Sequence, residues 1–296
     1  MQYIVCAPSY DENNGGAIFL HQLVHVLNAL GEKAFVWSMP EIYPLSKRQR
    51  LRRLFQPPRF ATSPELNTPV HLGDTAPDDA IVIYPELLKG NPLKAKNIVR
   101  WLLYKPGVLH PYEFTEDEMF YHCGEMFDVP ELTGGAPELV MWRRNRNYRN
   151  ENRPDRKGTC YIVRKGFEKT RLPETEAPDA IQIDGMSHAE INEIFNRCET
   201  FISYDEATMY SQFAAICGCD SIIVPGIFDT HDAWLASHPL APYGVAYGFE
   251  ALPHARAPRD KVKAFLDQQE NDSKDSVRNF ITLTKERFET LPKLET

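Results

Sequence analysis

From Thr200 to Pro225 the chain reads TFISYDEATMYSQFAAICGCDSIIVP. The residues 200–203 predict a buried strand, and the apolar run 221–224 predicts a second one. Between them, Tyr204-Asp205-Glu206 forms a polar turn, the residues 207–217 predict a helix, and Gly218 ends it. Strand, turn, helix and strand in this order form a βα unit. We therefore expect an α/β fold built on parallel sheets.

The polar turn after residue 203 lies where open α/β sheets bind their ligands, outside the carboxyl ends of the strands. The free N–H groups and the dipole at a helix start attract phosphate, and the hydroxyls of Thr208 and Ser211 would add donors. The same two hydroxyls could instead serve only as helix caps or helix-surface groups. The chain has no G-x-G-x-x-G or Walker lysine motif, which disfavours a dinucleotide or ATP.

The same alternation of strands and helices extends outward from this segment in both directions. In the second half we expect further strands at 159–163, 180–183 and 244–247, helices at 189–196 and 229–236, and one or two amphipathic helices over 260–289. In the first half a strand at 3–7 precedes the pair Gly15-Gly16 and a helix over 17–30. Later strands are expected at 34–37, 80–84, 98–103, 119–122 and 139–142.

Two domains follow from this pattern and from the length of 296 residues. The apolar pattern fails between Arg143 and Lys157, where we place a linker. The predicted domains are therefore 1–150 and 158–275, both of α/β type, followed by a helical segment over 276–296.

Composition narrows the classes of function. The formal net charge of −8 argues against general nucleic-acid binding, which draws on Lys and Arg. No secretion signal and no long apolar span are visible, so we expect a cytoplasmic protein. The six cysteines form no C-x-x-C pair and are expected to be reduced, structural thiols.

The segment 200–225 resembles the donor-binding segment of GT-B glycosyltransferases, in particular the large retaining family 4. The resemblance extends to Gly15-Gly16, which is similar to the glycine loop of the acceptor domain. It also extends to Arg164-Lys165-Gly166, where relatives carry an Arg and a Lys on the donor diphosphate. One feature differs: relatives usually have a second glutamate eight residues after the first acid, whereas Phe213 stands eight residues after Asp205.

The resemblance implies two Rossmann-like domains facing a cleft, with the helix over 276–296 packing back on the first domain. It also implies a metal-independent, hexosyltransferase-like enzyme of surface polysaccharide biosynthesis. The donor would be a UDP-, dTDP- or GDP-linked sugar, and the acceptor a glycan or a lipid-linked molecule. Arg164 and Lys165, with Lys169, would stabilise the diphosphate leaving group. The residues expected to contact the donor or its phosphates are Gly15, Gly16, Asp205, Thr208, Tyr210 and Ser211.

A general base for the acceptor hydroxyl is expected on the first domain. Glu86 is the first candidate because it follows directly on the strand 80–84, and Asp11 and Glu12 are alternatives. Glu86 could equally be a solvated loop carboxylate. His21 and His25 lie one helical turn apart, but without a third ligand we assign no metal.

Two further segments have open interpretations. Trp101, Tyr104, Lys105 and His110 surround a turn where aromatic rings stack on sugars or simply fill the core. The basic run Lys47 to Arg53 would suit peripheral contact with the inner membrane surface, or would form a solvated helix.

Two other functions compete with a glycosyltransferase. A nucleotide-sugar epimerase of the same build would use carboxylates and a histidine around one cleft. A non-catalytic protein that binds a sugar or nucleotide would need no second glutamate.

Overall fold

The computed structural model describes residues 1–40, 59–108, 110–238 and 241–289. The chain divides into two compact units: unit 1 comprises 1–143 and 270–296, and unit 2 comprises 144–269. Each unit contains one parallel five-stranded sheet, which confirms the α/β class predicted from the sequence. The long helix α9 (Lys261–Glu289) starts in unit 2 and ends in unit 1.

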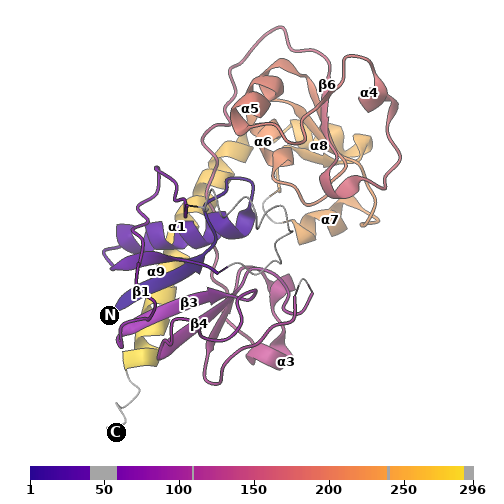
Figure 1. Ribbon diagram of the computed structural model, residues 1–296. Helices are drawn as coiled ribbons and strands as arrows, with labels where there is room; N and C mark the ends of the chain where they lie inside the picture. The colour runs from indigo at the N-terminus through magenta and orange to yellow at the C-terminus, as the bar shows by residue number, and fades with distance from the viewer. Residues whose placement is uncertain (41–58, 109, 239–240, 290–296) are drawn as a thin grey trace, which may run out of the picture. The chain divides into compact units, whose positions relative to one another are not determined.

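Unit 1 is built on a sheet with strand order β2-β1-β3-β4-β5 (Figure 1). Its elements in chain order are β1 (Gln2–Ala7), α1 (Gly15–Ala29), β2 (Ala34–Ser38), β3 (Ala80–Pro85), β4 (Asn97–Leu102), β5 (Met119–His122), η1 (Glu125–Phe127) and α3 (Pro130–Thr133). The order places β1 beside β3, and this is the topological switch point of a doubly wound sheet.

The two faces of the unit 1 sheet are covered in different ways. Side chains alternate along β1, so Tyr3 and Val5 point to one face and Ile4 and Cys6 to the other. The first face packs against α1 and against the part of α9 around Phe280. Among the described residues, the second face packs against loop residues, including Leu88, Leu93 and Ala95 from the connection between β3 and β4.

Arg100 holds that loop in place. Its guanidinium is fully buried, donates to both carboxylate oxygens of Glu118 at 2.7 Å, and donates to the carbonyls of Pro85, Leu88 and Gly90. A buried charge is tolerated when it is paired and hydrogen-bonded in this way. The Arg100 network therefore replaces the helix that usually connects two parallel strands.

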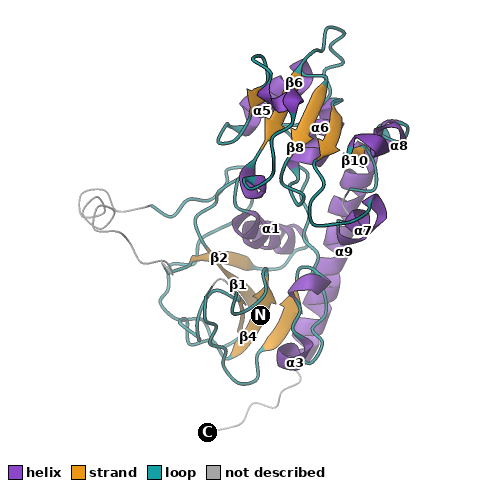
Figure 2. Ribbon diagram, turned by 90° about the vertical axis from the view of Figure 1, so that its right-hand side faces the viewer, coloured by secondary structure: helices purple, strands orange, loops and turns teal. Residues whose placement is uncertain are grey.

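Unit 2 repeats the same topology. Its sheet has the order β10-β9-β8-β6-β7, which is the order of unit 1 when the strands are counted within the unit. Its elements are β6 (Thr159–Ile162), η2 (Arg164–Gly166), α4 (Pro173–Glu176), β7 (Ile181–Gln182), α5 (His188–Arg197), β8 (Thr200–Ser203), α6 (Tyr210–Cys217), β9 (Asp220–Ile223), α7 (His231–Ser237), β10 (Val245–Tyr247), η3 (Phe249–Ala251) and α8 (Leu252–Arg256). The secondary structure is coloured in Figure 2. The switch point lies between β6 and β8.

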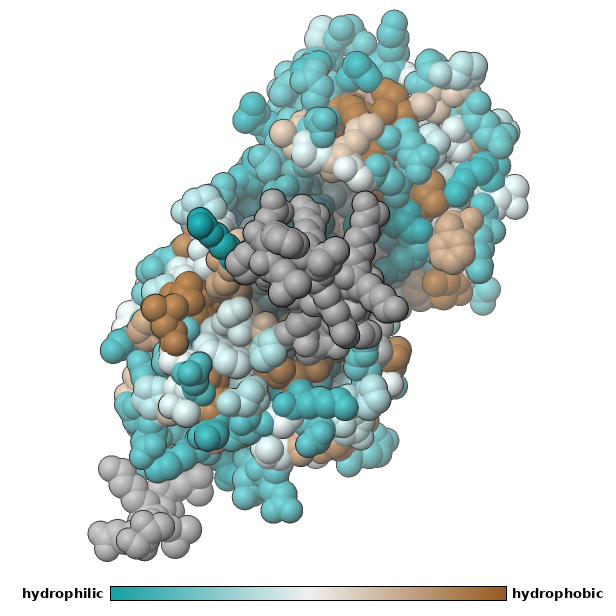
Figure 3. Space-filling view, in the orientation of Figure 1, coloured by the Kyte–Doolittle hydropathy of each residue, from teal (hydrophilic) through white to brown (hydrophobic). Residues whose placement is uncertain are grey.

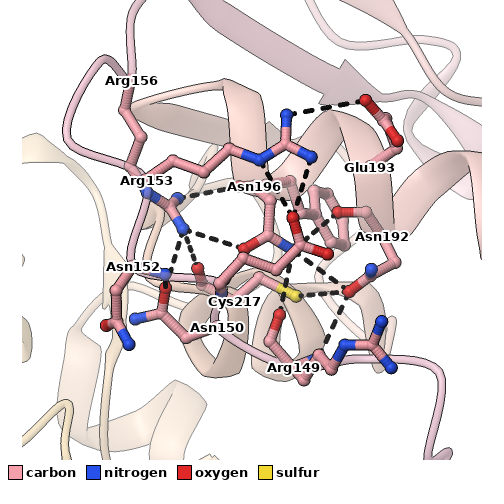
Figure 4. Close-up of polar contacts among 11 residues, drawn as sticks. Arg149, Asn150, Asn152, Arg153, Arg156, Asn192, Glu193, Asn196 and Cys217 are labelled. Atoms are coloured by element: carbon pink, nitrogen blue, oxygen red, sulfur yellow. Dashed lines mark hydrogen bonds and ion pairs between the residues drawn. The ribbon is translucent and has the colours of Figure 1, made fainter.

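The segment before β6 packs on unit 2 through Arg156. The guanidinium donates to the carbonyls of Phe195 and Cys198 at the end of α5 and to the carbonyl of Cys217 at the end of α6. Figure 4 shows the same group directed toward Asn150 and Cys217. A cation at the carboxyl end of a helix is favourable because it meets the negative end of the dipole, and Arg156 does so for two helices.

The predicted strand over 139–142 is not formed. Leu139, Met141 and Trp142 are buried as expected, but the backbone N–H groups of Val140 and Trp142 donate to the hydroxyls of Ser276 and Ser273 on α9. The segment is extended and makes only an isolated bridge between Glu138 and His122. Serine hydroxyls of α9 thus accept the backbone hydrogen bonds that a neighbouring strand would accept in a sheet.

Candidate functional site

The switch point of the unit 2 sheet brings together the loops that follow β6 and β8. Gly166 in the first loop lies against Tyr204 in the second so closely that an added Cβ would stand 2.2 Å from the Tyr204 carbonyl oxygen. Glycine is therefore required at position 166 for steric reasons alone. The contact places Arg164 and Lys165 beside the turn that contains Asp205 and Thr208.

Arg164 has a left-handed backbone conformation, with φ of 39°. The carboxylate of Asp184, just after β7, holds this conformation by accepting the N–H groups of Val163 and Arg164, each at 3.0 Å. A non-glycine residue in this region is strained, and strained residues concentrate at functional sites. The Arg164 guanidinium extends over the ring of Tyr210, 5.7 Å from its centroid, and Arg164 and Lys165 are both exposed.

The helix after β8 begins at Tyr210, three residues later than the sequence predicts. Asp205 closes the intervening turn, because its carboxylate accepts the N–H of Ala207 at 3.1 Å. Thr208 consequently precedes the helix, and its hydroxyl accepts the N–H of Tyr210 at 3.4 Å. The predicted placement of Thr208 in the first helical turn is thus wrong, and its hydroxyl bonds within the turn that leads into the helix.

Ser211 lies in the first turn of α6 and is fully buried, and its hydroxyl has no hydrogen-bond partner among the described residues. Tyr210 is also buried, and its ring stacks on His188 with the centroids 5.8 Å apart. The start of α6 therefore carries one hydroxyl without a partner among the described residues, and the Arg164 guanidinium lies over the ring of its first residue.

Two charged residues that the sequence interpretation left without a defined role contribute to this site. The guanidinium of Arg171 lies 4.5 Å from the centroid of the Tyr204 ring, and its Nη1 is buried without a partner among the described residues. Glu206 is buried and accepts bonds from the Lys169 ammonium at 2.9 Å, the Ile227 N–H and the Tyr247 hydroxyl. The cluster of Arg and Lys residues between positions 164 and 171 is the sequence feature that could have identified Arg171 as a site residue.

Lys169 is consequently engaged in the fold. Besides Glu206, it donates to the carbonyl of Val224 at 2.6 Å. Its side chain is 20% exposed and the Glu206 side chain 3% exposed. We therefore assign Lys169 to holding the loop after β9. Arg164, Lys165 and Arg171 remain as candidate phosphate-binding cations at the carboxyl edge of the unit 2 sheet.

Phe213 occupies the position where the resemblance would place a second glutamate. Its ring is buried and stacks on Tyr148, with centroids 4.3 Å apart and planes at 11°. An aromatic pair packed in this way belongs to the core. No ribose-binding carboxylate can be supplied from this position.

Gly15, Gly16 and Glu86 lie at the carboxyl edge of the other sheet, in unit 1. Gly15 and Gly16 begin α1, which Asn14 caps by accepting the N–H of Ala17 at 3.1 Å. A Cβ at Gly15 would meet nothing within 4 Å, and one at Gly16 would make only ordinary contacts. The packing of the fold therefore does not require either glycine, and the start of α1 has no side chain over its first two residues.

Glu86 is almost completely buried beside the end of β4. Its Oε2 accepts the N–H of Leu103 at 3.0 Å. Burial raises the pKa of this carboxyl above its usual value, and bonds from the backbone N–H groups of Leu103 and Tyr104 oppose that shift. A buried carboxyl at a switch point is a candidate proton acceptor with a physical reason for its altered pKa.

His21 and His25 have separate partners. His21 Nε2 lies 2.9 Å from the carbonyl oxygen of Pro8, and His25 Nδ1 accepts the N–H of Asn67 at 3.0 Å. Among the residues that the structure describes, no group of three or more His, Cys, Asp or Glu side chains could hold a metal ion.

The basic run Lys47 to Arg53 lies outside the described residues. In the remainder, no helix combines the length and apolar character needed to cross a membrane. On the face shown in Figure 3, hydrophobic residues form small patches among hydrophilic ones.

No protein-family model and no curated protein matches this chain.

Proposed function

We propose that the chain is a glycosyltransferase of the GT-B type. It would transfer a hexose from a UDP-, dTDP- or GDP-linked donor to a glycan or lipid-linked acceptor, in surface polysaccharide biosynthesis. The observation that carries this proposal is the meeting of Arg164, Lys165 and the start of α6 at the switch point of the unit 2 sheet.

The chemistry of the donor diphosphate supports this assignment. Its negative charge grows as the bond to the sugar breaks, so cations and helix N–H groups aimed at it lower the barrier. Arg164 and Lys165 are exposed and available for phosphate, whereas the Ser211 hydroxyl is fully buried, so the two cations carry this part of the proposal. A carboxylate repels phosphate, so Asp205 is assigned to hydroxyl groups of the sugar. Tyr210 would position the Arg164 guanidinium through the cation–π contact.

The acceptor would bind to unit 1. In the reaction an acceptor hydroxyl oxygen forms a bond to the anomeric carbon, the bond between that carbon and the phosphate oxygen breaks, and its electron pair leaves with the nucleoside diphosphate. The hydroxyl proton goes to a base, for which we propose Glu86. Burial raises the pKa of this carboxyl above its usual value, which makes the carboxylate a stronger base.

The first test is release of nucleoside diphosphate from a panel of UDP-, dTDP- and GDP-sugars, together with the thermal shift that each donor produces. Arg164→Ala should weaken donor binding about 10-fold to 100-fold, since hydrogen bonds to charged groups contribute roughly 1.5–3 kcal/mol. Lys157→Ala is the matched control, because Lys157 is an exposed lysine just before the amino end of β6. Equal effects of the two variants would contradict the assignment of the donor site.

A second candidate is a non-catalytic protein that binds a nucleotide or nucleotide sugar. The observation that favours it is Phe213, which packs into the core where relatives of the resembled family carry a glutamate. Clear binding of donors without any release of nucleoside diphosphate, with every acceptor supplied, would favour this candidate over the enzyme.

A further inference from the structure

The loop that follows β4 carries two exposed tyrosines, Tyr104 and Tyr112, and Tyr104 directly follows Leu103, whose N–H donates to Glu86. Trp101 is fully buried in the core of unit 1, whereas Tyr104 is 40% exposed. The structure therefore shows a difference in exposure between two aromatic residues that the sequence treated alike. Only Tyr104 of this pair can present a ring to a ligand.

The ring of Tyr104 is held in place from two sides. It packs against Phe127, with the centroids 5.4 Å apart. Its backbone is held by Glu86, whose carboxylate accepts the N–H groups of Leu103 and Tyr104. A ring that is already immobilised loses little conformational entropy when a ligand binds, which favours its use in recognition.

The amino end of α1 reaches the same place. A Cβ on Gly16 would lie 3.7 Å from Cδ1 of Leu103, the residue before Tyr104. Leu103 and Tyr104 therefore connect the Glu86 carboxylate with the start of α1. An exposed aromatic ring, a buried carboxylate and the amino end of a helix occur together at one edge of the sheet.

We propose that this edge of unit 1 is an acceptor subsite for a pyranose ring, with Tyr104 as the residue that stacks on the sugar. The inference rests on the proposed function. The C–H face of a pyranose suits an aromatic ring, and its hydroxyls suit a carboxylate and backbone N–H groups. Tyr104 is followed by Lys105, which is also exposed and can donate to sugar hydroxyls. The acceptor group that we propose for this edge is the sugar end of a glycan.

The test measures acceptor kinetics in the full chain with a panel of methyl pyranosides of glucose, galactose, mannose and N-acetylglucosamine. Tyr104→Ala should raise the acceptor KM about 5-fold to 10-fold and leave the donor KM unchanged, because only the stacking contact is lost. Tyr104→Phe keeps the ring and should behave as the wild type. Tyr243→Ala is the matched control, since Tyr243 packs on Phe265 just before the amino end of β10.

A second readout separates this inference from the proposed function. Saturation-transfer NMR detects binding of the same methyl pyranosides without any donor or turnover, and thermal melting checks that each variant is folded. If no donor is ever cleaved but pyranoside binding disappears in Tyr104→Ala, the proposed enzyme is wrong and the sugar site stands. If transfer occurs with an unchanged acceptor KM in folded Tyr104→Ala, or if no pyranoside binds, the subsite is wrong.

Discussion

Arg164 is the residue where backbone strain and charge coincide. Its left-handed φ of 39° is held by the carboxylate of Asp184, and its side chain reaches over Tyr210. A left-handed conformation costs roughly 1–2 kcal/mol for a residue with a Cβ, and glycine avoids this cost. A merely structural turn would be more stable with glycine at this position, so the arginine points to a use for its guanidinium.

Arg164→Gly should therefore be more stable than Arg164→Ala by about 1 kcal/mol, since both remove the guanidinium and only glycine relieves the strain. Urea unfolding of the two variants gives the difference. Lys165, whose φ is not positive, provides the comparison: Lys165→Gly should be less stable than Lys165→Ala by about 0.5–1 kcal/mol. If the glycine and alanine variants ranked in the same order of stability at both positions, the inferred strain at Arg164 would be wrong.

His21 makes the stability of unit 1 depend on pH. The ring is fully buried between Tyr10 and Phe60, and burial lowers its pKa below the ordinary value of 6.5. The unfolded chain then binds a proton more readily than the folded one. The stabilisation is fully present above about pH 6.5 and decreases as the pH falls toward the folded pKa.

His21→Gln should lose less unfolding free energy than the wild type between pH 7 and pH 5, because glutamine does not titrate and can still donate to Pro8. Urea unfolding at the two pH values measures the difference. His25, whose pKa is also lowered, should account for part of the remaining dependence. Parallel losses in wild type and His21→Gln would show that His21 is not responsible.

At the scale of elements, α9 substitutes for a strand. Its serines 273 and 276 accept the N–H groups of Trp142 and Val140 at 2.8 and 2.9 Å, and these groups would otherwise bond to a sheet neighbour. The buried backbone of 139–142 is satisfied without extending the sheet. This explains why a segment with a strand-like apolar pattern is not a strand.

Ser273→Ala should destabilise the protein by about 1–3 kcal/mol, because the N–H of buried Trp142 loses its acceptor. Thr282→Ala is the control on the same helix, since its exposed hydroxyl bonds only to the carbonyl of Arg278 within α9. That variant should stay within about 0.5 kcal/mol of the wild type. Tryptophan fluorescence during urea unfolding reports both, and similar losses would refute the special role of Ser273.

At the scale of the whole molecule, the chain returns to unit 1 after completing unit 2. Residues 270–289 place Val277, Phe280 and Phe288 in the core that also contains Tyr3 and Leu23. Unit 1 is therefore discontinuous in sequence and incomplete without the end of α9. Unit 2, in contrast, is continuous over 144–269.

A chain ending at residue 269 should keep unit 2 folded and lose unit 1, since one face of the unit 1 sheet would be exposed to water. Hydrogen exchange should show protection retained in β8 and β9 and lost in β1 and β3. A chain ending at residue 289 is the control and should protect both sheets. Persistent protection of β1 and β3 in the shorter chain would show that α9 is dispensable for unit 1.

The sequence by itself determined the alternation of strands and helices, because periods of two and near four report directly on which face of an element is buried. It also placed Arg164, Lys165, Asp205 and Glu86 just after the carboxyl ends of strands, because the end of an apolar run marks the end of a buried strand. The bounds of β8 and β5 came out as predicted.

Only the tertiary structure decided the rest. The start of α6 at Tyr210 follows a turn that the Asp205 carboxylate closes, and helical periodicity does not register such a turn. The fate of 139–142 depends on serines more than 130 residues away. Local periodicity carries no information on these serines, because their hydrogen bonds join positions that are distant in the chain. The strain of Arg164 arises in the same way, from a carboxylate that a different strand brings to it.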